Sequence, residues 1–228
     1  MRDYPKRISG RRREPRRSKP LDSARLEELA LAYVARFATS AAKLEKYLTR
    51  KLRERGFVAN SAENWLPDEN EVDDDGDLAR EAGLTKIEEI VMRFVERGYV
   101  DDDLYAKTRA GSLLNRGYGA RRIEATLRQD GIADELREAN APGRGEARKA
   151  AVALARKRRF GPFASQHVGN DVIPEERDFL SSQEFRKLRD KQLAAMVRAG
   201  HDFADANAVL DARTIAEVEE WAAGDTYD

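Results

Sequence analysis

Residues 87–118, IEEIVMRFVERGYVDDDLYAKTRAGSLLNRGY, contain the pattern that decides the fold. Ile87, Ile90 and Phe94 recur at the spacing of one face of an α-helix. Gly98-Tyr99 should end that helix, because glycine readily takes the left-handed conformation after a helix and the next apolar residue packs against the last turn. The stretch therefore predicts two helices joined by a short glycine turn.

The same kind of helix end recurs along the chain. A basic residue, a glycine and an aromatic residue follow one another in Arg55-Gly56-Phe57, Arg97-Gly98-Tyr99 and Arg116-Gly117-Tyr118, and Gly131-Ile132 is a looser copy. Aligning Arg116-Gly117-Tyr118 with Gly200-His201 also aligns the apolar residues that follow. We therefore predict a three-helix unit used three times, stacked into an elongated, curved array.

Apolar spacing and capping residues predict the other helices. A first helix carries Leu26, Ala30 and Phe37 on one face, and another spans Ala147–Phe160. Capping residues mark the start of five more, namely Ser40, the Thr85–Glu88 pair, Asp101–Asp103, the Ser181–Glu184 pair and the Thr214–Glu217 pair. No useful stretch alternates between apolar and polar residues, so we predict an all-α fold.

Charge is segregated along the chain although the net charge is zero. A basic segment almost without apolar residues cannot form a core, so the N-terminal tail should be disordered. The predicted organisation is a basic tail at 1–20, a first repeat at 21–99 with an acidic insertion at 58–82, a second repeat at 100–143, a third repeat at 144–222 with a loop insertion at 161–180, and a C-terminal tail at 223–228.

Several classes of function are excluded by composition. The chain has no cysteine, which excludes disulfides and cysteine-ligated metals and fits a cytoplasmic protein. No run of 18 apolar residues is present, so no transmembrane helix is predicted. His167 and His201 lack zinc or triad spacing, and the acidic residues 71–76 lack the glutamate that an EF-hand requires at position 82. We therefore expect no catalytic, cofactor or metal site.

Two groups of basic residues remain as candidate binding residues. One surrounds the glycine at 117, and the other precedes Phe160. Either group fits a solvated helix face or a surface that binds acidic protein or nucleic acid. The seven residues are Arg116, Arg121, Arg122, Arg156, Lys157, Arg158 and Arg159.

The sequence resembles the RecX family, the small regulators of the RecA recombinase. The resemblance rests on residues 90–106, on 115–132 and on the basic stretch 154–160. It extends over about residues 24–222, and its specific part is 87–160. The basic tail, the acidic insertion and the loop insertion depart from the family pattern.

The resemblance implies three tandem three-helix repeats and a non-enzymatic function. RecX proteins lie in the groove of the RecA–single-stranded DNA filament, bridge neighbouring protomers, and restrain its ATPase and strand exchange. We therefore expect a cytoplasmic monomer that inhibits RecA in DNA repair, recombination and the SOS response. Its partners would be the RecA filament and single-stranded DNA phosphate. The alternative is a helical nucleic-acid-binding module of helix-turn-helix type, against which the zero net charge and the lack of an obvious dimer element weigh.

Overall fold

The computed structural model describes residues 19–59, 74–164 and 180–224. Within these ranges all regular structure is helical apart from one isolated parallel bridge between Leu21 and Phe57. The elements are α1 (Ser23–Val34), α2 (Ala41–Arg55), α3 (Asp74–Glu96), α4 (Asp102–Asn115), α5 (Ala120–Gln129), α6 (Asp134–Ala139), α7 (Arg144–Arg158), the 3-10 helix η2 (Gly161–Phe163), α8 (Leu180–Arg198), α9 (Phe203–Asp211) and α10 (Ile215–Ala223). The all-α prediction is confirmed.

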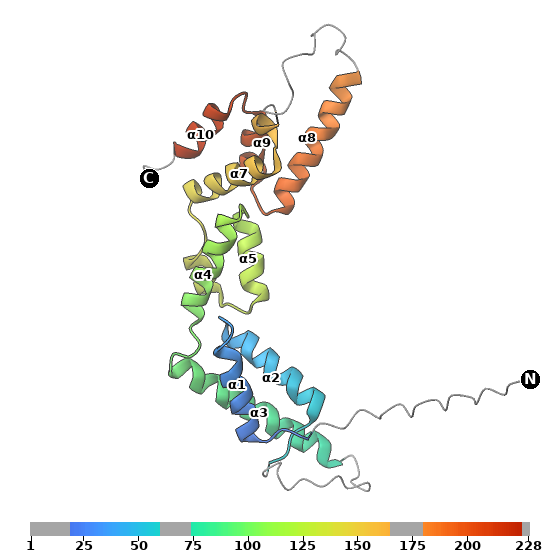
Figure 1. Cartoon of the computed structure of the whole chain (residues 1–228), viewed down its shortest axis with the longest axis vertical. Coiled ribbons are helices and arrows are strands. Elements are labelled where there is room, and N and C mark those ends of the chain that lie inside the picture. The colour runs from blue at the N-terminus through green and yellow to red at the C-terminus, as the bar shows by residue number, and fades with distance from the viewer. Residues whose placement is uncertain (1–18, 60–73, 165–179, 225–228) are drawn as a thin grey trace, which may run out of the picture.

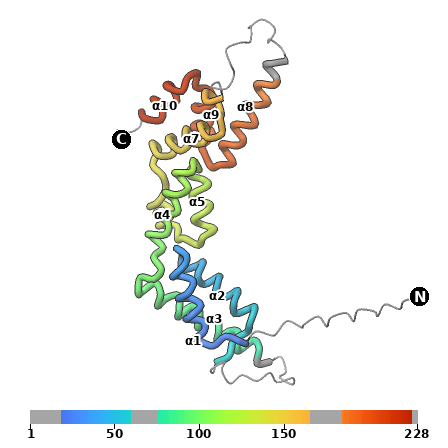
Figure 2. The backbone as a smooth tube through the Cα atoms, viewed as in Figure 1, coloured from blue at the N-terminus to red at the C-terminus, as the bar shows by residue number. Residues whose placement is uncertain are grey.

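The helices form an elongated, bowed array of packed units (Figures 1 and 2). Helices α1–α3 lie at one end, α4–α6 in the middle, and α7–α10 at the other end. Each unit buries its own apolar cluster, centred on residues such as Phe94 in the first, Leu127 in the second and Met196 in the third. The array is long because each unit buries its apolar side locally and against its neighbours.

The predicted glycine helix ends are present. Positive φ angles occur at Gly98, Gly117, Gly131 and Gly200. Gly56 also has a positive φ of 76°, but its ψ of 174° differs from the predicted left-handed helical conformation. At Gly98 the backbone N–H of Tyr99 donates to the carbonyl of Phe94 at 2.9 Å, which is the expected six-residue closure. Arg159 takes the same left-handed conformation without being glycine, with a φ of 58°. The N–H of Phe160 donates to the carbonyl of Ala155 there, so α7 ends in the same way.

The start of α3 differs from the prediction. The helix begins at Asp74, so the end of the predicted acidic insertion 58–82 is helical rather than a loop, while 60–73 lie outside the described residues. The prediction of a Thr85–Glu88 capping box is wrong, because Thr85 lies inside the helix and its hydroxyl donates to the carbonyl of Glu81 at 3.1 Å. Residues 78–82, LAREA, are good helix formers and extend the helix backwards, and Gly83 is buried against the end of α2.

Three other helix limits also differ. Helix α1 ends at Val34, so Phe37 lies outside it and is 56% exposed rather than on a buried face. Helix α7 begins at Arg144, three residues before the predicted start. Helix α8 begins at Leu180, which places Ser181 inside the helix rather than at its cap. Helix limits of this kind depend on tertiary contacts that apolar spacing does not report.

The predicted loop insertion at 161–180 is partly described. Gly161–Phe163 form the 3-10 helix η2, whose Pro162 and Phe163 are buried. Residues 165–179 lie outside the described part of the chain, as do residues 1–18 of the basic tail and 225–228. Those predictions are therefore not tested.

The second helix of each unit is stacked on that of the next. Helices α8, α5 and α2 follow one another along one side of the array (Figure 1). At the first contact, the N–H groups of Gly119 and Arg121 donate to the carbonyls of Ala199 and Gly200 at 2.9 and 3.1 Å. N–H groups at the start of a helix and carbonyl groups at its end have no partner within that helix. Here the N–H groups at the start of α5 and the carbonyl groups at the end of α8 satisfy one another.

The corresponding contact between α5 and α2 sets the register of the repeat. A Cβ atom on Gly131 would lie 2.2 Å from Cβ of Ala42 in α2, and a Cβ atom on Gly200 would lie 2.3 Å from the backbone N of Arg122 in α5. Gly200 is therefore equivalent to Gly131. The predicted alignment of Gly200 with Gly117 is therefore wrong, because it is displaced by one helix.

Candidate functional site

The contact between α8 and α5, which we name the glycine joint, consists of Gly117, Gly119, Gly200 and His201. A Cβ atom on Gly119 would lie only 2.3 Å from the carbonyl oxygen of Gly200, so the two backbones touch. His201 is 2% exposed, and its Nε2 lies 3.0 Å from the carbonyl oxygen of Gly117. Burial lowers the pKa of His201, against the smaller opposing effects of that hydrogen bond and of Asp205. The imidazole is a neutral structural link.

The contact between α5 and α2, which we name the polar joint, consists of Ser40, Lys43, Tyr105 and Asp130. The ammonium of Lys43 donates to the Tyr105 hydroxyl at 2.9 Å and to Asp130 at 3.2 Å. The Tyr105 hydroxyl donates to the other carboxylate oxygen of Asp130 at 2.7 Å. Ser40 caps α2 and donates to the backbone carbonyl of Asp130 at 2.5 Å. The bonds made by Ser40 and Lys43 cross from the first unit to the second, whereas the bond between Tyr105 and Asp130 lies within the second unit.

The ionisable groups of the polar joint have shifted pKa values. Burial alone would lower the pKa of Lys43, but its hydrogen bonds to Tyr105 and Asp130 more than compensate, so its pKa is raised. Burial raises the pKa of Tyr105, and its bond to Asp130 acts in the same direction. Both groups therefore favour the protonated form in the folded protein.

The seven predicted basic residues are exposed and stand at helix ends. Arg116 follows α4, Arg121 and Arg122 lie in the first turn of α5, and the other four occupy the end of α7. The glycine joint brings α5 and α8 together, and a Cβ atom on Gly117 would lie 3.0 Å from the backbone N of Leu154 in α7. The residues therefore lie on helices that pack around the boundary between the second and third units.

The predicted basic residues differ in what they contact. Arg121 is paired with Asp202 at 3.1 Å. Arg156 is paired with Glu219, and its guanidinium lies 5.3 Å from the centre of the Phe163 ring. Among the described residues, salt bridges are not made by Arg116, Arg122, Lys157, Arg158 and Arg159. Within the part of the chain that the structure describes, these five side chains have no acidic partner, and the guanidinium of Arg116 lies 5.2 Å from the centre of the Tyr118 ring.

A second basic surface was missed by the sequence analysis. A groove of about 930 Å³ lies between α1 and α2. We name it the aromatic groove, and its defining side chains are Tyr33, Arg36, Phe37, Lys46, Tyr47, Arg50 and Arg53. The available signal was the spacing of Lys46, Arg50 and Arg53 at i, i+4 and i+7, which puts them on one helix face.

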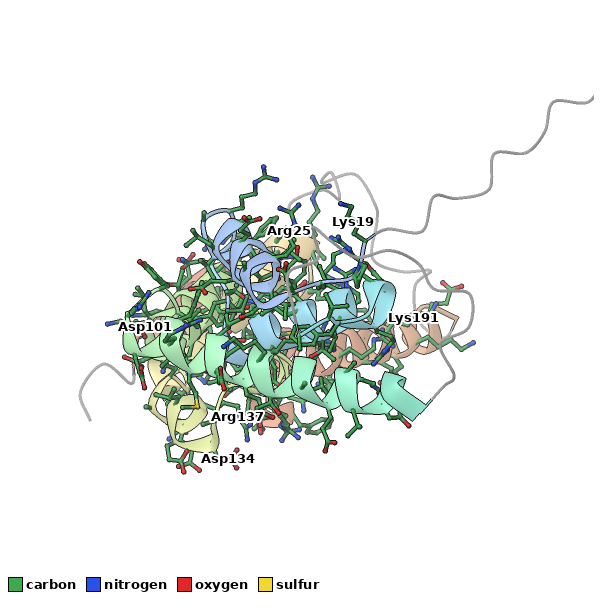
Figure 3. The ribbon with its side chains drawn as sticks, turned by 90° about the horizontal axis from the view of Figure 1, so that it is seen from below. Lys19, Arg25, Asp101, Asp134, Arg137 and Lys191 are labelled. Atoms are coloured by element: carbon green, nitrogen blue, oxygen red, sulfur yellow. The ribbon has the colours of Figure 1, made fainter. Side chains whose placement is uncertain are left out.

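Charges elsewhere on the array are more often paired. Seen along the long axis, Lys19, which precedes α1, and Arg25 of α1 lie on the opposite side from Asp134 and Arg137 of α6 (Figure 3). Arg25 is paired with Glu28, and Arg137 with Asp134 at 2.7 Å. Among the described residues, exposed cations without a salt bridge also occur on α8, at Arg186 and Lys187, but the cations of the aromatic groove lie beside aromatic rings and those of α7 are consecutive.

The described residues show no arrangement suited to catalysis by a metal. No group of three or more His, Asp and Glu side chains among them could hold a metal ion. The imidazole of His201 is hydrogen-bonded to a backbone carbonyl, and His167 lies outside the described ranges. In the part of the chain that the structure describes, no helix is long and apolar enough to cross a membrane.

The fold defines a class: an all-α protein whose small helical units stack end to end. Comparison with known proteins narrows that class. Residues 101–139 match the family model described as RecX, second three-helix domain. "Regulatory protein RecX" of Myxococcus xanthus (strain DK1622) is 29% identical over 202 residues, which is 87% of this chain and 91% of that protein. The resemblance to the RecX family is therefore confirmed.

A solved structure has the same fold. The crystal structure of RecX from Lactobacillus salivarius matches with a TM-score of 0.52 and 16% sequence identity. The match covers 83% of this chain and 96% of the other. Both sequence comparisons are to a regulatory protein rather than to an enzyme.

Proposed function

We propose that this protein is a non-enzymatic inhibitor of the RecA recombinase that lies in the groove of the RecA–single-stranded DNA filament. The observation that carries the proposal is the bowed, end-to-end array of helical units together with the RecX resemblance. An elongated array presents one long surface. Such a surface suits a helical polymer, because it can contact several protomers at once.

The proposed contact surface is the basic boundary between the second and third units. Arg122, Lys157 and Arg158 are exposed and make no salt bridge among the described residues. Unpaired cations at helix ends attract acidic protein surface or DNA phosphate. Bound in the groove, the protein would restrain ATP hydrolysis and strand exchange, and thereby recombinational DNA repair. We propose that it acts in the cytoplasm as a monomer.

Charge reversal at α7 tests the proposal. Lys157→Glu combined with Arg158→Glu changes two exposed side chains and leaves the Arg156–Glu219 pair in place. Like charges brought together across an interface cost several kcal/mol, so the variant should inhibit RecA ATPase only at far higher concentration. The assay measures ATP hydrolysis by preformed filaments at fixed salt against increasing protein.

The matched control reverses Arg186 and Lys187 of α8, which are also exposed. Both variants should unfold at the wild-type urea concentration. Equal inhibition by both variants and wild type would show that the α7 cations are only a solvated face. Failure of the wild-type protein to affect the filament, with binding to naked DNA retained, would favour the helix-turn-helix alternative.

A further inference from the structure

We propose that the aromatic groove between α1 and α2 binds single-stranded DNA, stacking an unpaired base on Phe37 and holding the backbone with Arg36, Lys46, Arg50 and Arg53. The inference depends on the proposed function in one respect only, because the proposed function identifies the bound strand as the DNA of the RecA filament. The site lies in the first unit, away from the basic boundary between the second and third units.

Phe37 is the most informative residue of the groove. Its side chain is 56% exposed, although its N–H donates to the carbonyl of Tyr33 at 3.0 Å and fixes the turn after α1. Its ring centre lies 5.3 Å from that of Tyr33 at an angle of 47°. An exposed ring that packs against a second ring is an element that proteins use to stack a base of a single strand.

Two tyrosines support that ring. Tyr33 and Tyr47 are stacked, with ring centres 4.2 Å apart and planes 16° from parallel. The guanidinium of Arg50 lies 5.7 Å from the centre of the Tyr47 ring. The stacked pair fills the space between α1 and α2 and forms the floor of the aromatic groove. Phe37 is not needed to fill that space, and it adds exposed ring surface.

The charge of the groove complements phosphate. Four cations line it, and Glu45 is its one acidic lining residue. Among the described residues, no salt bridge engages Arg36, Lys46 or Arg53. Lys46, Arg50 and Arg53 extend along two turns of α2, about 10 Å at the rise of an α-helix. A line of cations beside aromatic rings fits a chain of phosphates whose bases are free.

The chemistry favours a single strand over two other occupants. A duplex keeps its base faces stacked, so it would contact the cations but not Phe37. An acidic peptide would likewise use the cations but gains little from an exposed ring. Phosphate contacts supply salt-dependent affinity and stacking supplies affinity that depends little on salt, so the two can be measured separately.

The experiment measures the affinity of the full chain for a fluorescently labelled oligothymidylate by anisotropy, over a range of salt concentrations. Phe37→Ala should weaken binding at least fivefold, because stacking is worth about 1–3 kcal/mol per base. Its salt dependence should stay unchanged. The matched control is Phe203→Ala, which removes a ring that is 59% exposed on α9; it should bind as the wild type does.

The cations are tested with Arg50→Ala combined with Arg53→Ala. Loss of two phosphate contacts should reduce the slope of log affinity against log salt by about 1.4, at about 0.7 per contact for single strands. Arg186→Ala combined with Lys187→Ala on α8 removes the same charge elsewhere and should leave that slope unchanged.

An abasic strand of the same length measures the contribution of base stacking, because it keeps the phosphates and lacks the bases. The wild-type protein should bind it more weakly than oligothymidylate, and Phe37→Ala should cause no further loss. Phe37→Ala binding oligothymidylate with wild-type affinity while its circular dichroism is unchanged would overturn the proposal. So would equal competition by polyglutamate and oligothymidylate, which would make the groove an acidic-peptide site. Either result is obtained without RecA and leaves the ATPase test of the proposed function standing.

Discussion

The two joints hold equivalent helices end to end by different chemistry. At the glycine joint the backbones of Gly119 and Gly200 touch, and two N–H groups of α5 donate directly to carbonyls of the neighbouring unit. At the polar joint, side chains make the connection, with Asp130 accepting from both Lys43 and Tyr105. Close approach occurs at both contacts, since a Cβ atom on Gly131 would lie 2.2 Å from Cβ of Ala42, and the polar joint adds a network of partly buried side chains to it.

The difference indicates how each joint should respond to change. A backbone contact tolerates no added atom, because neither backbone can move without displacing a helix. A network of side chains tolerates small rearrangements but depends on protonation and on every partner being present. We therefore expect steric sensitivity at the backbone contact of the glycine joint, and electrostatic sensitivity at the side-chain network of the polar joint in addition to the steric limit at Gly131.

The largest effect should follow from Gly119→Ala. The φ of Gly119 is −81°, which alanine accepts, so the cost is the contact of 2.3 Å between the new Cβ and the carbonyl of Gly200. We expect a loss of about 3 kcal/mol or more, which is exceptional for one methyl group. Urea unfolding followed by circular dichroism measures it.

Gly143→Ala is the control for that variant. Gly143 also caps a helix in extended conformation, with a φ of −63°, and a Cβ there would meet nothing within 4 Å. It should change stability by less than about 1 kcal/mol. Equal effects at the two glycines would contradict the close approach at the glycine joint.

A smaller loss should follow from Asp130→Ala at the polar joint. Its side chain is 12% exposed, and its removal leaves the Tyr105 hydroxyl and one Lys43 N–H without their acceptor and Arg109 without its ion pair, at a cost of about 1–3 kcal/mol. The double variant with Lys43→Ala should cost less than the sum of the single changes, because the two residues act as one network. Asp134→Ala, at a carboxylate that is 77% exposed, should stay within about 0.5 kcal/mol of wild type.

Arg159→Gly should stabilise the protein. Arg159 ends α7 with a φ of 58°, a conformation that costs an L-residue about 1–2 kcal/mol and glycine little. After allowing for the greater freedom of glycine in the unfolded chain, a gain of about 0.5–1 kcal/mol is expected. Arg158→Gly, one residue earlier and still in the helix, should have the opposite sign. Together, the Arg159→Gly and Arg158→Gly variants test the backbone conformation at a helix end. That requirement for glycine differs from the one at the glycine joint, where a close contact leaves no room for a side chain.

The smallest effects should be changes with pH, and their directions should differ at the two joints. The lowered pKa of His201 means that the unfolded chain binds its proton more readily, so stability is complete above about pH 6.5 and falls as the pH drops through the folded-state pKa. The raised pKa values of Lys43 and Tyr105 give stability that is complete below their ordinary pKa values and is lost as the pH rises through the higher folded-state values.

Hydrogen exchange of the amides at the joints distinguishes the two responses. Exchange at Gly119 and Arg121, whose N–H groups cross the glycine joint, should accelerate on acidification relative to the helix interiors. His201→Gln should remove that acceleration, since glutamine does not titrate. In Tyr105→Phe, the loss of stability above about pH 10 should be reduced. Acid acceleration that persists without His201 would assign the effect to another group.

Local pattern was sufficient for most helix ends. Asp101 and Thr214 cap α4 and α10 as predicted, with their side chains accepting from Leu104 N at 2.9 Å and Glu217 N at 3.2 Å. These are short-range bonds set by a few consecutive residues, so the sequence contains them fully. The predictions at Thr85 and Phe37 were wrong because packing against α2 extended α3 and the chain turned after Val34. The seven predicted basic residues are exposed at helix ends, and their role in binding RecA stays a prediction.

The sequence by itself determined that this protein is helical, where most of its helices end, and that it resembles RecX, because caps, glycine turns and apolar spacing act over a few residues. Only the tertiary structure decided the rest. It brought Ser40 against Asp130 and Gly119 against Gly200, pairs separated by 90 and 81 residues, and it left Phe37 exposed over stacked tyrosines. Such contacts depend on how whole units stack, and no short stretch of sequence encodes that arrangement.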